Sequence, residues 1–199
     1  MEQFDFDSIF NNAVGNMKYF IKKVKKYEEI KKHEDILKKD LLNAVNVFIE
    51  RFRNNPCICK NRNNHSSCTT NACGEIENRM KNWVEKLFEY SDDEEKLNEF
   101  FKIIAKDAMK FVELDFEPLY ILCGLEEIRE TAEEKLKEEL PTEEYLKVME
   151  EFDDLIERMS LVATAVYMEF EDRVFERMGI NKNLKYNIIK LGLKKMNIN

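Results

Sequence analysis

The chain has 199 residues, of which 44% are hydrophobic and 36% are charged, and its formal net charge is −8. These values are typical of a globular protein with one domain and a sizeable core, and they exclude a disordered chain. The acidic net charge disfavours nonspecific nucleic-acid binding. The chain contains no run of about 18 apolar residues, so no membrane-spanning helix is predicted.

Only five glycines and three prolines are present, so few turns can be built and the elements must be long. Lys, Glu, Leu and Met are abundant, which favours helices, and no convincing alternation of period two predicts strands. Residues 10–30 and 33–52 each carry one apolar stripe at steps of three and four. We therefore expect two helices in the first quarter of the chain.

Three further helices are predicted between residues 75 and 140. Residues 75–90 place Ile76, Met80 and Trp83 on one side. Ser91 and Glu94 then match a capping box, with Ser91 predicted as the N-cap of a helix over 95–116. Pro118 suits the first turn of the next helix, because proline lacks the amide hydrogen that is unpaired there.

The longest predicted helix covers residues 142–178. Its apolar spacing continues without a break from Tyr145 to Met178, Pro141 precedes it, and Gly179 suits the left-handed position after its end. Such a helix spans about 55 Å and needs partners along its length, either as the spine of a bundle or in a homodimer interface. After Gly179 there are five lysines and no acidic residue, and this basic tail, 180–199, is expected to contact the acidic face of the long helix.

Four of the five cysteines fall within a polar loop at residues 54–74, namely Cys57, Cys59, Cys68 and Cys73. Residues i and i+2 of an extended segment point the same way, so the first two thiolates can bind one ion. A loop this long and polar needs a bound metal ion or a disulfide, a staple, to order it. Cys73 in the first turn of the next helix would be stabilised as a thiolate by the helix dipole. We predict a structural Cys₄ zinc site, with His65 outside the ligand set or replacing one cysteine.

Other states of these cysteines remain open. Two disulfides could close the loop, as 57–68 with 59–73 or as 57–73 with 59–68, because a 57–59 bond would strain a small ring. An iron–sulfur cluster and free thiols are further alternatives. Cys123 is different, since it stands in an apolar run beside Gly124 and is expected to be a buried, inert thiol.

Sites of other kinds have weaker support. No Glu-x-x-His pattern and no phosphate-binding loop occurs, so a ferritin-like metal site would need carboxylates alone, such as Glu113 or Glu169. His33 lies among charged residues and is expected to be solvated. Lysines interleaved with aromatic residues at 17–27 could contact RNA or anionic lipid, although a solvated helix face explains them better.

The N-terminus is acidic and has no signal-peptide pattern, which indicates a cytoplasmic protein. A single glutamine with abundant Lys and Glu is typical of thermophiles, although nine methionines and many asparagines point the other way.

Together the helical patterns and the cysteine loop predict a single all-α domain, an antiparallel bundle of five to seven helices with a stapled loop. The function most compatible with it is a non-enzymatic interaction or scaffold module that binds a protein partner. The alternatives are a carboxylate-rich metal-binding bundle or enzyme of the ferritin-like class, and a nucleic-acid-associated accessory protein.

Overall fold

The computed structural model describes residues 5–17, 26–54, 70–114 and 116–195, and within these ranges every regular element is a helix, as predicted. The helices are α1 (Phe6–Met17), α2 (Glu28–Lys32), α3 (Glu34–Arg53), α5 (Thr70–Tyr90), α6 (Glu94–Glu113), α7 (Pro118–Glu139), α8 (Thr142–Arg177) and α9 (Lys182–Lys195). These eight described helices exceed the five to seven expected, because a short α2 precedes α3 and the basic tail forms α9.

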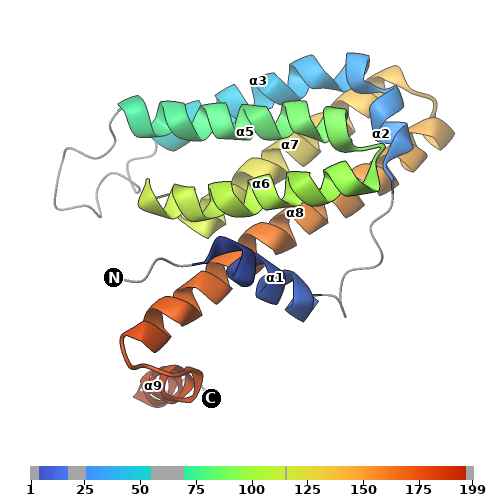
Figure 1. Ribbon diagram of the computed structural model, residues 1–199. Helices are drawn as coiled ribbons and strands as arrows, with labels where there is room; N and C mark the ends of the chain where they lie inside the picture. The colour runs from blue at the N-terminus through green and yellow to red at the C-terminus, as the bar shows by residue number, and fades with distance from the viewer. Residues whose placement is uncertain (1–4, 18–25, 55–69, 115, 196–199) are drawn as a thin grey trace.

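The long helices pack as a bundle in which successive elements run antiparallel (Figure 1). α3 packs against α5 and α7, and α5 also packs against α6. α8 lies against α1, α6 and α7. The helix α8 therefore forms the spine of the bundle for about two thirds of its length. Its last turns and α9 extend beyond the other helices at one end (Figure 1).

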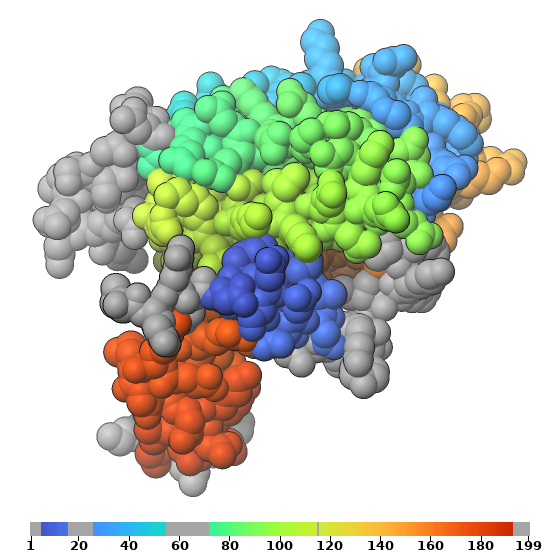
Figure 2. Space-filling model, viewed as in Figure 1, coloured from blue at the N-terminus to red at the C-terminus, as the bar shows by residue number. Residues whose placement is uncertain are grey.

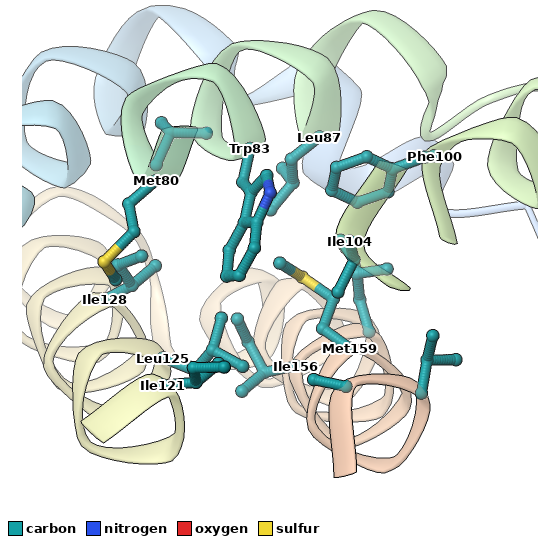
Figure 3. Close-up of a cluster of buried hydrophobic side chains, with 14 of the residues drawn as sticks. Met80, Trp83, Leu87, Phe100, Ile104, Ile121, Leu125, Ile128, Ile156 and Met159 are labelled. Carbon is teal, nitrogen blue, oxygen red and sulfur yellow. The ribbon is translucent and has the colours of Figure 1, made fainter. Parts of the chain in front are cut away.

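The core gathers around Trp83, which is fully buried and points from α5 toward α7 and α8 (Figure 3). Phe100 and Ile104 of α6 and Met159 of α8 surround the indole in this view. Phe111 lies 5.5 Å from it between ring centroids. The apolar stripes predicted for α3, α5 and α6 supply these buried side chains, so the period of the pattern identified the core faces correctly.

The long helix is continuous from Thr142 to Arg177, and Pro141 is its N-cap residue. Gly179 has a φ of 81°. Its amide donates to the carbonyl of Glu176 at 3.0 Å, and the amide of Ile180 donates to the carbonyl of Phe175 at 2.9 Å. These two bonds form a Schellman motif, which confirms the predicted glycine stop.

The predicted capping box is wrong, because Asp93 and not Ser91 caps α6. The carboxylate of Asp93 accepts hydrogen bonds from the amides of Glu95 and Lys96 at 2.9 and 3.2 Å. Ser91 is fully buried, and its carbonyl accepts a 2.7 Å hydrogen bond from the amide of Tyr27. Because Ser91 contacts the segment before α2, Asp93 and not Ser91 occupies the N-cap position of α6.

His33 was expected to be solvated, and this prediction is also wrong. Its side chain is buried at the junction of α2 and α3, with Nδ1 2.9 Å from the carbonyl of Glu29. Nε2 lies 3.2 Å from a carboxylate oxygen of Glu144 on α8. The neighbouring charges in the sequence concealed this contact, which joins residues 111 positions apart. The stripe predicted for residues 10–30 falls partly on 18–25, outside the described residues.

Candidate functional site

Of the four predicted zinc ligands, the described residues include only Cys73. It lies in the first turn of α5, as predicted, and its side chain is 3% exposed and part of the hydrophobic core. Cys57, Cys59 and Cys68, together with His65, lie outside the described residues. The convergence of the four thiolates on one ion therefore stays a prediction.

Cys123 was expected to be buried, but it is exposed on α7. The buried stripe of that helix passes through Ile121, Gly124 and Leu125. Cys123 precedes Gly124 by one residue, or about 100° around the helix, which turns its side chain away from the stripe. An apolar neighbourhood in the sequence did not identify this face.

A groove of about 630 Å³ follows the α5–α6 seam close to Cys73, and its lining includes Glu75, Asn78, Arg79 and Asp107. Asp107 is buried within the apolar stripe of α6. One of its oxygens accepts a 2.8 Å hydrogen bond from the indole Nε1 of Trp83, and the other pairs closely with Arg79. Arg79 also pairs with Glu75 at 2.8 Å, so this Asp107 groove holds a compensated charge network.

Burial raises the pKa of Asp107 above its ordinary value, against the opposing effect of the hydrogen bonds from Trp83 and Arg79. Sequence reasoning missed this residue, although a signal was present. Asp107 follows Phe100 and Ile104 at helical steps and precedes Phe111, so a single carboxylate stands in line with apolar residues.

A second groove, of about 480 Å³, lies between the start of α2 and the polar face of α8. The hydroxyl of Tyr27 donates a 2.7 Å hydrogen bond to Asp154, which also pairs with Arg158 at 2.8 Å. Glu151 accepts hydrogen bonds from the amides of Glu29 and Ile30 at 2.8 and 3.2 Å and thereby caps α2. The acidic residues of this Tyr27 groove thus hold α2 on the bundle.

Burial is the main influence on the pKa values of Tyr27 and Glu151, two of the titratable groups that line this groove. Together with the hydrogen bond to Asp154, it raises the pKa of the Tyr27 phenol well above its ordinary value. Burial also raises the pKa of Glu151, and the two backbone amides that it accepts from oppose the shift. The phenol therefore stays protonated at neutral pH and donates to the Asp154 carboxylate.

The two glutamates considered for a carboxylate site are both in ion pairs. Glu113 is exposed and pairs with Lys110 at 2.5 Å. Glu169 accepts from Arg173 at 3.0 Å and from the amide nitrogen of Asn12 at 3.3 Å. Among the described residues, no three or more His, Cys, Asp or Glu side chains are grouped so that they could hold a metal ion.

Apolar side chains are exposed on a projecting arm, which we define as residues 168–191 at the end of α8 and along α9. Figure 2 shows the later part of this segment projecting from the body of the molecule, whereas Glu169 and Arg173 at its start contact α1. Nine large apolar side chains are exposed across the described residues, and seven of them lie in the arm. These seven are Met168 (56% exposed), Met178 (68%), Leu184 (44%), Tyr186 (58%), Ile188 (53%), Ile189 (48%) and Leu191 (60%).

Within the arm, α9 is held to the end of α8 by charge, as predicted for the basic tail. Lys182 and Lys185 pair with Asp172 at 3.0 and 2.9 Å, and Lys185 also reaches Glu171 at 3.1 Å. The interpretation of 180–199 as a charged tail overlooked its apolar residues, although Leu184, Ile188 and Leu191 recur at steps of four and three.

No helix in the described parts of the chain combines the length and apolar character needed to cross a membrane.

Comparison with known proteins identifies one informative relative. No known family profile matches the chain. No solved structure is significantly similar to it. The uncharacterised protein MJ1356 of Methanocaldococcus jannaschii is 36% identical over 193 residues, which cover 97% of this chain and 98% of the relative. The similarity therefore extends over the bundle and the arm alike, and the chain belongs to the family of MJ1356.

Proposed function

We propose that the protein is a non-enzymatic interaction module, in which the helical bundle is a scaffold and the arm binds a protein partner. The observation that carries this proposal is the concentration of exposed apolar side chains on the arm. Single exposed apolar residues are ordinary, whereas a contiguous group on one projection is typical of a protein-binding surface. Leu119 and Leu146, the exposed large apolar residues outside the arm, stand on separate helices.

The two grooves support a structural role for their polar groups. In the Asp107 groove the buried carboxylate is neutralised by Arg79 and satisfied by Trp83. In the Tyr27 groove Glu151 caps a helix and Asp154 is held by Tyr27 and Arg158. Asp107, Glu151 and Asp154 are therefore engaged in structural contacts, which makes them unsuited to act as a free acid, base or nucleophile.

The proposal includes a structural zinc ion bound by Cys57, Cys59, Cys68 and Cys73. All four thiolates would be ligands, which leaves no open coordination position and makes the site structural rather than catalytic. The place of Cys73 at the start of α5 supports it, because an ion there would tie the loop to the first turn of a core helix. A cytoplasmic setting fits this proposal, since thiols stay reduced there.

The interaction is tested by photo-cross-linking in the native cells. A photoreactive amino acid replaces Ile188 in the arm or, as a matched control, Leu119, which is exposed to a similar degree on the bundle. We expect a defined protein adduct from position 188 and none from position 119. The absence of an adduct from 188, or the same adducts from both positions, would contradict the proposal.

A further inference from the structure

The helix α9 has apolar side chains on two opposite sides. Leu184, Ile188 and Leu191 form one stripe, and Tyr186 with Ile189 forms the other. At 3.6 residues per turn the two stripes point about 160° apart. All five side chains are 44–60% exposed, so the intramolecular contact of α9 covers neither stripe fully.

The contact of α9 with α8 falls between these stripes. Among residues 182–192, Lys185 and Gly192 are partly buried, and they lie on the same side of the helix. Lys185 pairs with Asp172 of α8, and its ammonium group lies 5.0 Å from the centre of the Phe175 ring. The α8 contact is therefore polar, and it leaves an apolar stripe on either flank.

A helix that is apolar on opposite sides is covered only when protein surrounds it. A membrane surface takes up one apolar face and leaves the other side in water, so it suits a helix with a single stripe. Nucleic acid would need a surface rich in free cations, but Lys182 and Lys185, two of the three lysines of α9 whose side chains the structure describes, already pair with α8. The pattern favours a protein partner that reaches both flanks of α9.

We infer that this partner is a second copy of the chain, whose arm packs against this arm around a two-fold axis. The inference rests on the proposed function of the arm and names its occupant. In such a pair the arm of the partner covers the two apolar stripes of α9 that its own α8 leaves open. A two-fold interface uses the same patch on both copies, so the patch must be complementary to itself. The arm carries apolar stripes together with acidic and basic residues, which allows such self-complementarity.

Charge complementarity supports self-association. Residues after Gly179 carry five lysines and no acid, whereas the first 179 residues hold 27 Lys and Arg against 40 Asp and Glu, a net charge of −13. Glu176 at the end of α8 and Lys190 on α9 are exposed side chains of opposite charge within the arm. The two-fold pairing sets the basic α9 of each copy against the acidic end of the other.

The size of the arm also fits. Residues 168–191 number 24. A stable interface of standard size uses about 20–30 residues from each partner. Fifteen of these 24 residues are exposed, so the arm supplies most of the residues that such an interface needs.

The test is the mass of the purified full chain in solution, measured by sedimentation equilibrium up to about 100 µM, where a dimer with micromolar Kd is the main species. We expect about 48 kDa, twice the 23.8 kDa of one chain. The dimer should persist in about 1 M NaCl, because the salt screens charges beyond about 3 Å but does not weaken apolar contacts. A monomer of 23.8 kDa throughout this range overturns the inference.

Two double variants test the stripes separately. The first variant, Leu184→Ser with Ile188→Ser, removes two of the three apolar side chains of one stripe. The second variant, Tyr186→Ser with Ile189→Ser, removes both apolar side chains of the other stripe. Each should raise the dimer Kd by about tenfold or more, because both stripes are buried by the partner. If one variant dimerises as the unchanged protein does, the two-sided arrangement is wrong.

A matched control carries Leu119→Ser and Leu146→Ser, which remove equally exposed apolar side chains outside the arm. It should dimerise like the unchanged protein, and an equal loss in the control overturns the assignment to the arm. The fluorescence of the single tryptophan, Trp83, reports that each variant keeps its core.

The failure of this inference can be separated from failure of the proposed function. If the chain is monomeric and position 188 cross-links to a different protein, the inference of a dimer is overturned. The proposal that the protein is an interaction module then still stands. A monomeric chain without any adduct overturns both. Binding of the monomer to vesicles of phosphatidylcholine and phosphatidylglycerol, lost in the Leu184→Ser, Ile188→Ser variant, overturns self-pairing in favour of a membrane surface.

Discussion

The indole Nε1 of Trp83 donates a 2.8 Å hydrogen bond to the carboxylate of Asp107, and both side chains are buried. The bond joins α5 to α6 across the core. Replacing Asp107 with alanine leaves the indole N–H without its acceptor, which should lower the free energy of unfolding by about 1–3 kcal/mol. Urea denaturation followed by the fluorescence of Trp83 measures the loss, and a midpoint equal to that of the unchanged protein would contradict the prediction.

The raised pKa of Asp107 has a pH signature. The folded protein binds this proton more tightly than the unfolded chain does, so the contribution of Asp107 to stability is greatest in acid and falls as pH rises from about 4 through the folded-state pKa. Above that pKa the contribution is constant. We expect the unfolding free energy of the unchanged protein, minus that of Asp107→Asn, to decrease as the pH rises above about 4. A difference that increases with pH would show that Arg79 outweighs burial.

Gly124 on α7 permits a close approach of α3 and α5. A Cβ at this position would overlap the Cε of Met80 and would lie 3.0 Å from Cε1 of Phe48. We expect Gly124→Ala to destabilise the protein by about 1–3 kcal/mol, because the overpacking outweighs the better helix propensity of alanine. Gly15→Ala in α1 is the control, since no atom lies within 4 Å of its Cβ, and it should be neutral or slightly stabilising.

Stability should depend on position along α8. Phe152 and Met159 are at most 1% exposed, and replacing either with alanine should cost about 2–5 kcal/mol. Met168 is 56% exposed, and its replacement should change the free energy of unfolding by less than about 0.5 kcal/mol. Thermal denaturation of the three variants tests this gradient, and equal losses at positions 159 and 168 would refute it.

The cysteine loop is tested by metal content. We expect about one zinc per chain, bound at the closed tetrahedral site that four thiolates form. All five cysteines should be titratable under denaturing conditions. Cys68→Ser should lose the zinc and lower the melting temperature while most of the helix remains. Cys123→Ser is the control, because this thiol is exposed and outside the site. Protein without metal, in which only Cys123 reacts until a reductant is added, would indicate two disulfides.

The sequence was informative wherever a local pattern controls the structure. The helical period predicted the core faces of α3, α5 and α6, and the absence of Gly and Pro predicted an unbroken α8. It was less informative where a distant contact selects between similar local options. Ser91 and Asp93 are both good caps, and the hydrogen bond between Tyr27 and Ser91 is formed by a segment more than 60 residues away.

The predicted sites illustrate the same limit. The spacing of Cys57, Cys59, Cys68 and Cys73 predicts a metal ion without reference to the fold, and it stays a prediction. The arm could not be identified in this way, because the apolar pattern of α8 continues to Met178 although no residue after Val166 is fully buried. Periodicity shows which side of a helix is apolar, but it does not show where the neighbouring helices end.

The unbroken backbone of α8 has a mechanical consequence. Its 36 residues form a rod about 54 Å long, with one part clamped between α1, α6 and α7 and the other part bearing the arm. No glycine or proline divides the two parts, so the rod has no joint between them. A load applied to α9 would therefore be transmitted along α8, first to its contacts with α1 at Glu169 and Arg173 and then toward Met159 inside the bundle.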